Sequence, residues 1–272
     1  MHGKGDFSIS TFALIDRPLP DAIRQLIDGG WTSIELMCED GHRELLDWNE
    51  KQLDELRALG DRHGIRWSFH APVYSMNPCA ADRAERAASK SVLHRAMDVA
   101  EYLGCAYVVV HAGMEKGERD GQDAQDRCVS FLSEILAERR PSPLKLALEN
   151  VPPKPNLHGV SPAFVRTVVE CVASPRLGIL FDAGHAHVLG PGACLAGLEV
   201  CLPYLIGMHL NDNMGDYDSH LAVGMGNIPY PELVQKVTSN RFQGNWVVET
   251  ESVLYAEQTV ERLSVLRDRY NR

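Results

Sequence analysis

The chain has 272 residues, of which 44% are hydrophobic and 24% are charged, as in an ordinary globular protein. Its formal net charge of −10 gives no general attraction to a phosphate backbone, although a local nucleic-acid groove is still allowed. No apolar run approaches the roughly 20 residues that a membrane helix needs, and residues 1–6 contain no apolar signal core. The seven cysteines form no CxxC pair, so we expect reduced thiols in a cytoplasmic protein.

Short apolar runs alternate along the chain with segments of helical periodicity. The first strand is predicted over 7–14, followed by a helix over 19–28 and a strand over 33–37. Further helices are predicted over 50–63, 82–103, 127–140, 161–172, 194–202, 229–238 and 255–270. The strands between them are predicted over 65–69, 107–110, 144–148, 177–181, 205–208 and 245–248. The chain therefore repeats one strand–helix unit from end to end.

This repeat predicts the fold class. Continuously apolar strands separated by helices form parallel sheets that are buried on both faces. About eight such units in one chain of this length favour a closed (β/α)8 TIM barrel, a single α/β domain over residues 1–272. The competing fold is an open doubly wound sheet, which is less favoured because no GxGxxG or phosphate-binding loop follows any strand.

Seven of the predicted strands end at a carboxylate or an imidazole. These residues are Glu35, His70, His111, Glu149, Asp182, His209 and Glu249. In a parallel barrel the carboxyl ends of all strands open on one face, so these side chains are expected to converge. Acids buried together repel one another, and a divalent cation removes that cost because it favours ionised carboxylates and neutral imidazoles. We expect zinc, manganese, iron or cobalt, about one to three ions per chain.

Further candidate ligands follow two of these strands. His185 comes three residues after Asp182, and Asp218 and His220 share one side of an extended segment. Any one of these residues, taken singly, has an ordinary structural alternative. A histidine at a strand end is more often hydrogen-bonded in the core or rim, and an acid there is often a helix N-cap. The metal prediction therefore depends on the whole set and not on single residues.

Several motifs, in this order, resemble the xylose-isomerase-like TIM barrel superfamily, which contains sugar isomerases and epimerases as well as endonuclease IV. They are FHAP (69–72), VVHAG (109–113), LALEN (146–150), FDAGHAH (181–187), MHLND (208–212), DSHLAVGMGNI (218–228) and VVETE (247–251). The resemblance implies a core metal site at Glu149, Asp182, His209 and Glu249. Similarity to endonuclease IV implies additional metal sites formed by His70 and His111 with Glu149, and by His185, Asp218 and His220.

Similarity to the ketose 3-epimerases implies an activity. Glu149 and Glu249 would be the carboxylates that remove and return a proton next to a carbonyl. The predicted substrate contacts or supports of the ligands are His185, Glu35, His187 and Asn211, with rim hydrogen bonding as their alternative role. Apolar walls for a sugar are predicted at Phe12, Trp48, Trp67 and Tyr74, with core packing as the alternative. We therefore expect a metal-dependent isomerase, epimerase or related lyase that acts on a small-molecule carbohydrate or its phosphate.

Two other functions remain open on the sequence. One is an endonuclease IV-like multinuclear phosphodiesterase that cleaves at abasic sites, and the other is a non-catalytic sugar-binding barrel. The nuclease has a basic, aromatic recognition loop after the second strand, whereas segment 38–47 here is mainly acidic and would repel a phosphate backbone. Segment 72–77 also lacks basic residues. Nucleic acid is thus a disfavoured partner, and a homodimer is expected only because dimers are common.

Overall fold

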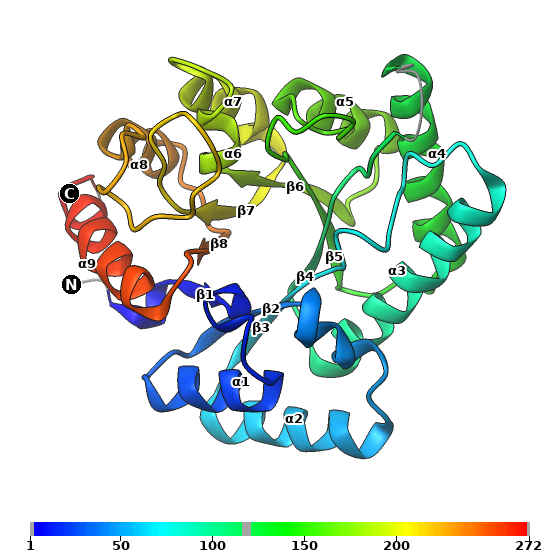
Figure 1. Cartoon of the computed structure of the whole chain (residues 1–272), viewed down its shortest axis with the longest axis horizontal. Coiled ribbons are helices and arrows are strands. Elements are labelled where there is room, and N and C mark those ends of the chain that lie inside the picture. Colours follow the sequence, from blue (N-terminus) through cyan, green and yellow to red (C-terminus); the bar gives the residue numbers. More distant parts are fainter. Residues whose placement is uncertain (1–2, 116–120, 271–272) are drawn as a thin grey trace.

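The computed structural model describes residues 3–115 and 121–270, and its strands form a closed parallel barrel inside a ring of helices (Figure 1). Each strand pairs with its neighbours in chain order, and β1 closes the barrel against β8. The strands are β1 (Ser8–Ser10), β2 (Ser33–Met37), β3 (Arg66–His70), β4 (Tyr107–Val110), β5 (Lys145–Glu149), β6 (Leu177–Asp182), β7 (Leu205–Leu210) and β8 (Asn245–Val248). The predicted (β/α)8 barrel is confirmed.

Helices connect successive strands and cover the outside of the barrel. The α-helices are α1 (Leu19–Asp28), α2 (Glu50–His63), α3 (Arg83–Leu103), α4 (Gly121–Glu138), α5 (Pro162–Val172), α6 (Ala183–His187), α7 (Ala193–Cys201), α8 (Tyr230–Ser239) and α9 (Val253–Tyr270). Short 3-10 helices are η1 (Lys4–Asp6), η2 (Thr11–Leu14), η3 (Asp40–Leu46) and η4 (Leu202–Tyr204). Among the described residues, no helix has the length and apolar character needed to cross a membrane.

Local sequence signals explain where the helices between β2 and β4 begin and end. Asn49 forms a capping box with Gln52 at the start of α2, and Asp82 accepts a hydrogen bond from the amide of Glu85 at the start of α3. Both helices end at a glycine in the left-handed conformation, Gly64 at φ 63° and Gly104 at φ 70°. These signals lie in the sequence itself, which is why the predicted boundaries agree within one residue.

Two predicted elements need correction. The strand predicted over 7–14 ends at Ser10, because the Ser10 hydroxyl accepts from the amide of Phe12 and the chain turns into η2. The helix predicted over 127–140 starts earlier, at Gly121, and ends at Glu138. Its first turns are polar and lack the apolar spacing on which the prediction depended. The short elements η3 and α6 were not predicted.

The hydrophobic core has two parts. A large cluster fills the space between the sheet and the helices, and Phe69, Phe131 and Phe181 are fully buried in it. A small cluster of Tyr107, Val109, Ala147 and Leu180, with Ile206 packed against it, lies apart from the large one. Alternation along the strands produces this division because successive side chains point to opposite faces of the sheet. The packed sheet holds the strand ends at fixed relative positions.

Candidate active site

The strand-end acids and histidines gather at the carboxyl ends of the strands. The structure forms three groups in which one ligand atom from each residue lies within 4.8 Å of the others. The groups are Glu149, Asp182, His209 and Glu249 (the core cluster), His70, His111 and Glu149 (the second cluster), and His185, Asp218 and His220 (the third cluster). All nine residues named as metal ligands from the sequence are therefore in one of these clusters.

In the core cluster the imidazole of His209 faces three carboxylates. Its Nδ1 lies 2.9 Å from Glu149 Oε1, 3.3 Å from Glu249 Oε2 and 3.8 Å from Asp182 Oδ2. Asp182 and His209 are paired neighbours in the β6–β7 register, which places their side chains side by side. Asp182 also caps α6, because its Oδ1 accepts from the amide of His185 at 2.7 Å. All four core side chains are buried.

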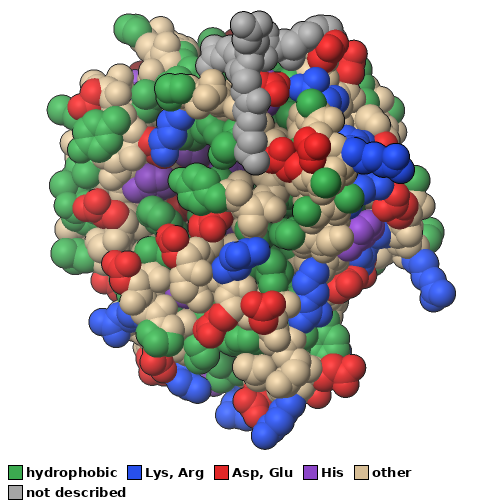
Figure 2. Space-filling model, turned by 45° about the vertical axis from the view of Figure 1, so that its right-hand side comes forward, with side chains coloured by type: hydrophobic (Ala, Val, Ile, Leu, Met, Phe, Trp, Pro, Cys, Tyr) green, Lys and Arg blue, Asp and Glu red, His purple; other side chains and the backbone are tan. Residues whose placement is uncertain are grey.

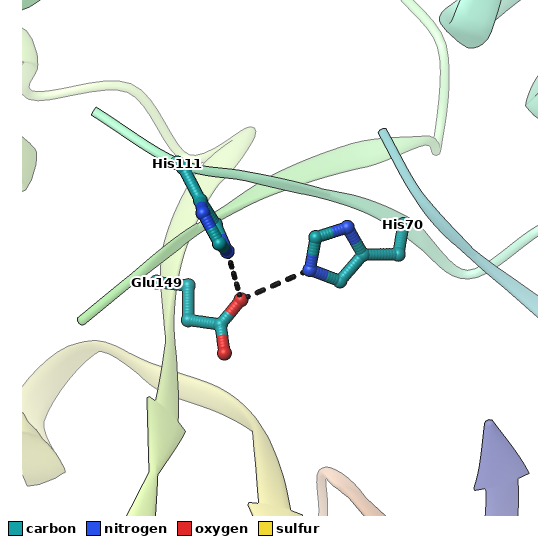
Figure 3. Close-up of side chains that lie close together, drawn as sticks. All are labelled: His70, His111 and Glu149. Atoms are coloured by element: carbon teal, nitrogen blue, oxygen red, sulfur yellow. Dashed lines mark hydrogen bonds and ion pairs between the residues drawn. The ribbon is translucent and has the colours of Figure 1, made fainter. Parts of the chain in front are cut away.

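The second cluster shares Glu149 with the core cluster. Figure 3 shows both histidines pointing at one carboxylate oxygen, with His111 Nε2 2.9 Å and His70 Nε2 3.1 Å from Glu149 Oε2. His70 Nδ1 donates to the carbonyl oxygen of Ala71 at 2.8 Å. A carbonyl oxygen can only accept, so this bond fixes the proton on Nδ1 and leaves Nε2 as the ligand atom.

The third cluster repeats this arrangement around Asp218. His185 Nε2 and His220 Nε2 lie 3.1 and 3.2 Å from the same oxygen, Asp218 Oδ2. Their Nδ1 atoms donate to backbone carbonyls, of Asn150 for His185 and of Glu249 for His220, both at 2.8 Å. Both rings are thereby oriented with Nε2 toward the carboxylate, as ligand histidines are in metal sites.

The electrostatics show a site with an excess of negative charge. Burial raises the pKa of Asp182 to about 6, and the nearby charge of Glu149 adds to that effect. Burial alone would lower the pKa of His185, but Asp182 and Asp218 raise it to about 10. Burial is likewise outweighed at His220, where the bond to Asp218 helps to raise the pKa to about 9. Without a bound cation these histidines supply the compensating positive charge as protons.

The donor set fits divalent transition-metal ions. Carboxylate oxygens and imidazole nitrogens are the ligands of zinc, manganese, iron and cobalt sites. Two buried carboxylate oxygens, Glu249 Oε1 and Asp218 Oδ1, have no hydrogen-bond partner in the part of the chain that is described. Such atoms are costly to bury unless another group binds them. Oxygens without partners next to oriented imidazoles are therefore consistent with a bound cation.

Three residues predicted as substrate contacts or supports do not line the cavity, and two of them, Glu35 and Asn211, lie behind the ligands. Glu35 is fully buried and bonds His209 Nε2 at 2.7 Å, and Asn211 donates to Asp182 Oδ2 at 3.1 Å. His187 Nε2 lies 2.6 Å from Asn227 Oδ1. The fourth such residue, His185, lines the cavity. Glu35 and Asn211 are therefore placed to orient the candidate metal ligands His209 and Asp182.

Two residues that the sequence reasoning did not single out also organise the site. Asn150 donates to the carbonyl oxygen of Asp182 and accepts from its amide, both at 2.9 Å. The Asp212 carboxylate accepts from three backbone amides, those of Asn213, Gly224 and Ile228. It thereby holds the loop that carries Asp218 and His220 of the third cluster. In the sequence, the only indication of a role for Asn150 and Asp212 was their position in the LALEN and MHLND motifs.

A cavity of about 450 Å³ opens above the clusters. His70, His111, His185 and His220 line it together with Glu149, Asp218 and Glu249. Its remaining lining is mostly apolar and includes Phe12 and Tyr74. Figure 2 shows histidine side chains between hydrophobic ones on this part of the surface. Trp48 and Trp67 do not line this cavity and are buried in the core, which is the alternative role given for them.

The fold and the clusters together define a class of protein, a TIM barrel with an acid–imidazole site at the carboxyl ends of its strands. Comparison with known families agrees with this class. The family model described as "Xylose isomerase-like TIM barrel" matches residues 23–269, and the chain belongs to that family.

Similar proteins include sugar epimerases and endonucleases. A solved structure described as a D-tagatose 3-epimerase-like protein is 26% identical, covers 98% of both chains and superposes with a TM-score of 0.88. Fructoselysine 3-epimerase of Escherichia coli O157:H7 is 23% identical over 92% of this chain and 94% of its own. A probable endonuclease 4 of Mycoplasmopsis pulmonis is 29% identical but covers only 56% of each chain. The two relatives with epimerase names thus extend over nearly the whole barrel, whereas the endonuclease match covers about half of it.

Proposed function

We propose that this protein is a divalent-metal-dependent isomerase or epimerase that moves a proton on a carbon next to the carbonyl group of a small sugar. The observation that carries the proposal is the pair Glu149 and Glu249, at or next to the ends of β5 and β8, which both line the cavity and belong to the core cluster. The full-length relatives named as sugar epimerases support the same reaction class.

Glu149, Asp182, His209 and Glu249 would hold the metal ion. A divalent ion bound there would polarise the substrate carbonyl and stabilise the negative charge that develops on its oxygen. The histidine is oriented in advance, because Glu35 bonds its Nε2 and leaves Nδ1 toward the carboxylates. The protein therefore supplies an assembled ligand set that needs little reorganisation.

The two glutamates would carry the proton. Burial would raise the pKa of Glu149, but His209 and His111 outweigh that effect and hold it well below the usual value. Glu149 is thus ionised and able to accept a proton. Glu249 has an oxygen, Oε1, without a hydrogen-bond partner among the described residues, and it faces the same cavity. One carboxylate removes the proton and the other returns one. The result is either inverted configuration at the carbon next to the carbonyl or a shift of the carbonyl group to that carbon.

The experiment is deuterium exchange. Purified protein with bound metal is incubated in deuterium oxide with a panel of ketoses and ketose phosphates, and NMR detects deuterium on the carbon next to the carbonyl. We expect exchange with at least one sugar, and loss of exchange in Glu149→Gln and Glu249→Gln. The matched control is Glu251→Gln, because Glu251 is an exposed neighbour of the site. Full exchange by metal-free protein or by Glu149→Gln would sink the proposal.

Phosphodiester hydrolysis is a second candidate, and the completeness of the second and third clusters favours it. A multinuclear site can bind both the attacking and the leaving oxygen of a phosphate ester. The mouth of the cavity argues against a nucleic-acid backbone, since Glu39 and Asp40 lie beside one cation, Lys154, among the described residues of its lining. Metal-dependent nicking of a duplex with one abasic site would favour this second candidate over the epimerase.

A further inference from the structure

A second cavity lies at the opposite end of the barrel from the clusters. It has a volume of about 480 Å³ and shares no lining residue with the active-site cavity. Its lining includes Ser8, Ser33, Arg66 and Asn245, which are the first residues of β1, β2, β3 and β8. The amino ends of the strands in a TIM barrel usually serve stability, so a polar cavity of this size there needs an explanation.

This cavity is positively charged within an acidic protein. Three arginines line it, Arg66, Arg241 and Arg267, and its only acidic lining residue is Asp6. None of the three forms an ion pair with a carboxylate in residues 3–115 or 121–270. A guanidinium has five N–H donors, yet the described contacts of Arg66 and Arg267 are single bonds to the carbonyls of Gly5 and Asp6. Most of these donors are thus left for solvent or a ligand.

One of the arginines is held in place before any ligand binds. The guanidinium carbon of Arg267 lies 5.2 Å from the ring centre of Phe7 and 4.8 Å from that of Trp246. These two aromatic rings fix the plane of the guanidinium and remove part of its hydration. Arg267 is therefore a preorganised donor, although the negative charges of Asp6 and Asp268 lie near it.

We infer that the cavity at the amino ends of the strands binds the phosphate group of a small phosphorylated metabolite through Arg66, Arg241 and Arg267. Arginine is suited to this ligand, because its planar fork bonds two phosphate oxygens at once. The volume lies within the usual range of about 300–1,000 Å³ for small-molecule sites, so it accommodates an organic portion beside the phosphate. This inference is independent of the proposed reaction, because the two sites have no residue in common.

The test is a titration of the full-length protein with inorganic phosphate at constant ionic strength, followed by calorimetry and by phosphorus NMR. We expect saturable binding that Arg66→Gln and Arg241→Gln each weaken by about tenfold, the effect of losing one charge-assisted contact. Arg83→Gln is the matched control, because exposed Arg83 begins α3 at the other end of the barrel and its loss changes the net charge equally. Its affinity for phosphate should equal that of the unmodified protein.

Two outcomes would overturn the inference. One is the absence of saturable phosphate binding, or equal binding by the arginine variants and the unmodified protein. The other is binding that His111→Ala weakens while Arg241→Gln does not, because the phosphate would then occupy the strand-end clusters. Arg66 and Arg241 are exposed, so urea unfolding should show near-native stability for their variants. A loss of phosphate affinity can therefore be separated from a loss of fold.

Discussion

Glu35 Oε1 and His209 Nε2 lie 2.7 Å apart although 174 residues separate them in the chain. Both side chains are fully buried, and the hydroxyl of Ser68 donates to the second oxygen of Glu35 at 2.9 Å. Burial alone would raise the pKa of Glu35, but His209 outweighs it and lowers the pKa, so Glu35 is an anion. This carboxylate–histidine pair is the arrangement that orients ligand histidines in metal sites.

Replacing Glu35 should therefore lower the metal affinity of the core cluster without changing the lining of the cavity, to which Glu35 does not belong. We expect Glu35→Gln to reduce the affinity of the core cluster for zinc by about 10–100-fold, the usual effect of losing a partner of a ligand histidine. Competition with a chromophoric chelator measures this affinity. Ser68→Ala, which removes only the hydrogen bond to Glu35, should have a smaller effect. Unchanged zinc affinity in Glu35→Gln would show that Glu35 does not orient His209.

Loss of Asp212 should release the loop that carries Asp218 and His220, and so disrupt the third cluster. Its carboxylate binds the amides of Asn213 at 3.0 Å, Gly224 at 2.6 Å and Ile228 at 3.1 Å, which are spread over the loop that contains Asp218 and His220. Asp212→Ala is expected to lower the metal content by about one ion per chain and to cost about 3 kcal/mol of stability. Elemental analysis and urea unfolding measure the two effects.

The control for Asp212 lies in the same loop. Asp216 is exposed and, within the described part of the chain, accepts only from the amide of its neighbour Tyr217, at 2.8 Å. Asp216→Ala should keep both the metal content and the stability within about 0.5 kcal/mol of the unmodified protein. A full complement of metal in Asp212→Ala would contradict a positioning role for Asp212.

Metal binding should release protons, and its affinity should depend on pH. In the metal-free protein His185 has a pKa of about 10 and His220 of about 9, so both are protonated at pH 7.5. A metal ion needs their neutral form, so zinc affinity should rise with pH up to about pH 9–10. Calorimetry in two buffers of different ionisation enthalpy counts the protons. Zinc binding with no proton release would contradict this prediction.

The stability of the metal-free protein should depend on pH in the opposite direction: it should fall as the pH rises. Both histidines have pKa values raised above the ordinary 6.5, so the folded state binds protons more tightly than the unfolded state. The resulting stabilisation is complete below about pH 6.5 and disappears as the pH rises through about 9 and 10. Chelator-treated protein should therefore lose stability between pH 7 and 10 in urea titrations. Equal stability across that interval would contradict the raised pKa values.

A cavity made in the core between the sheet and the helices should lower the stability of the barrel. Phe131 in α4 is fully buried, and the guanidinium carbon of Arg86 lies 5.4 Å from its ring centre. Phe131→Ala should cost about 3–5 kcal/mol in urea unfolding. Val265→Ala, at a side chain that is 68% exposed, should change the stability by less than about 0.5 kcal/mol. A loss below about 1 kcal/mol for Phe131→Ala would mean that the core relaxes around the gap.

The sequence by itself determined the barrel and the identity of the clustered residues. The repeat of strand and helix is a local signal, and the caps at Asn49, Gly64 and Gly104 mark helix boundaries without help from the rest of the chain. Once the strands are parallel, their last residues must lie on one face, so the sequence alone groups Glu149, Asp182 and the other strand-end ligands.

Only the tertiary structure decided how these residues are used. The bond between Glu35 and His209 joins segments that are distant in the chain, and the burial of Trp67 results from packing between elements. Such contacts depend on strand register, ring orientation and side-chain packing, which no local pattern encodes. The arginine-lined cavity has the same origin, because it forms where the starts of β1, β2, β3 and β8 meet the end of α9 after the barrel closes.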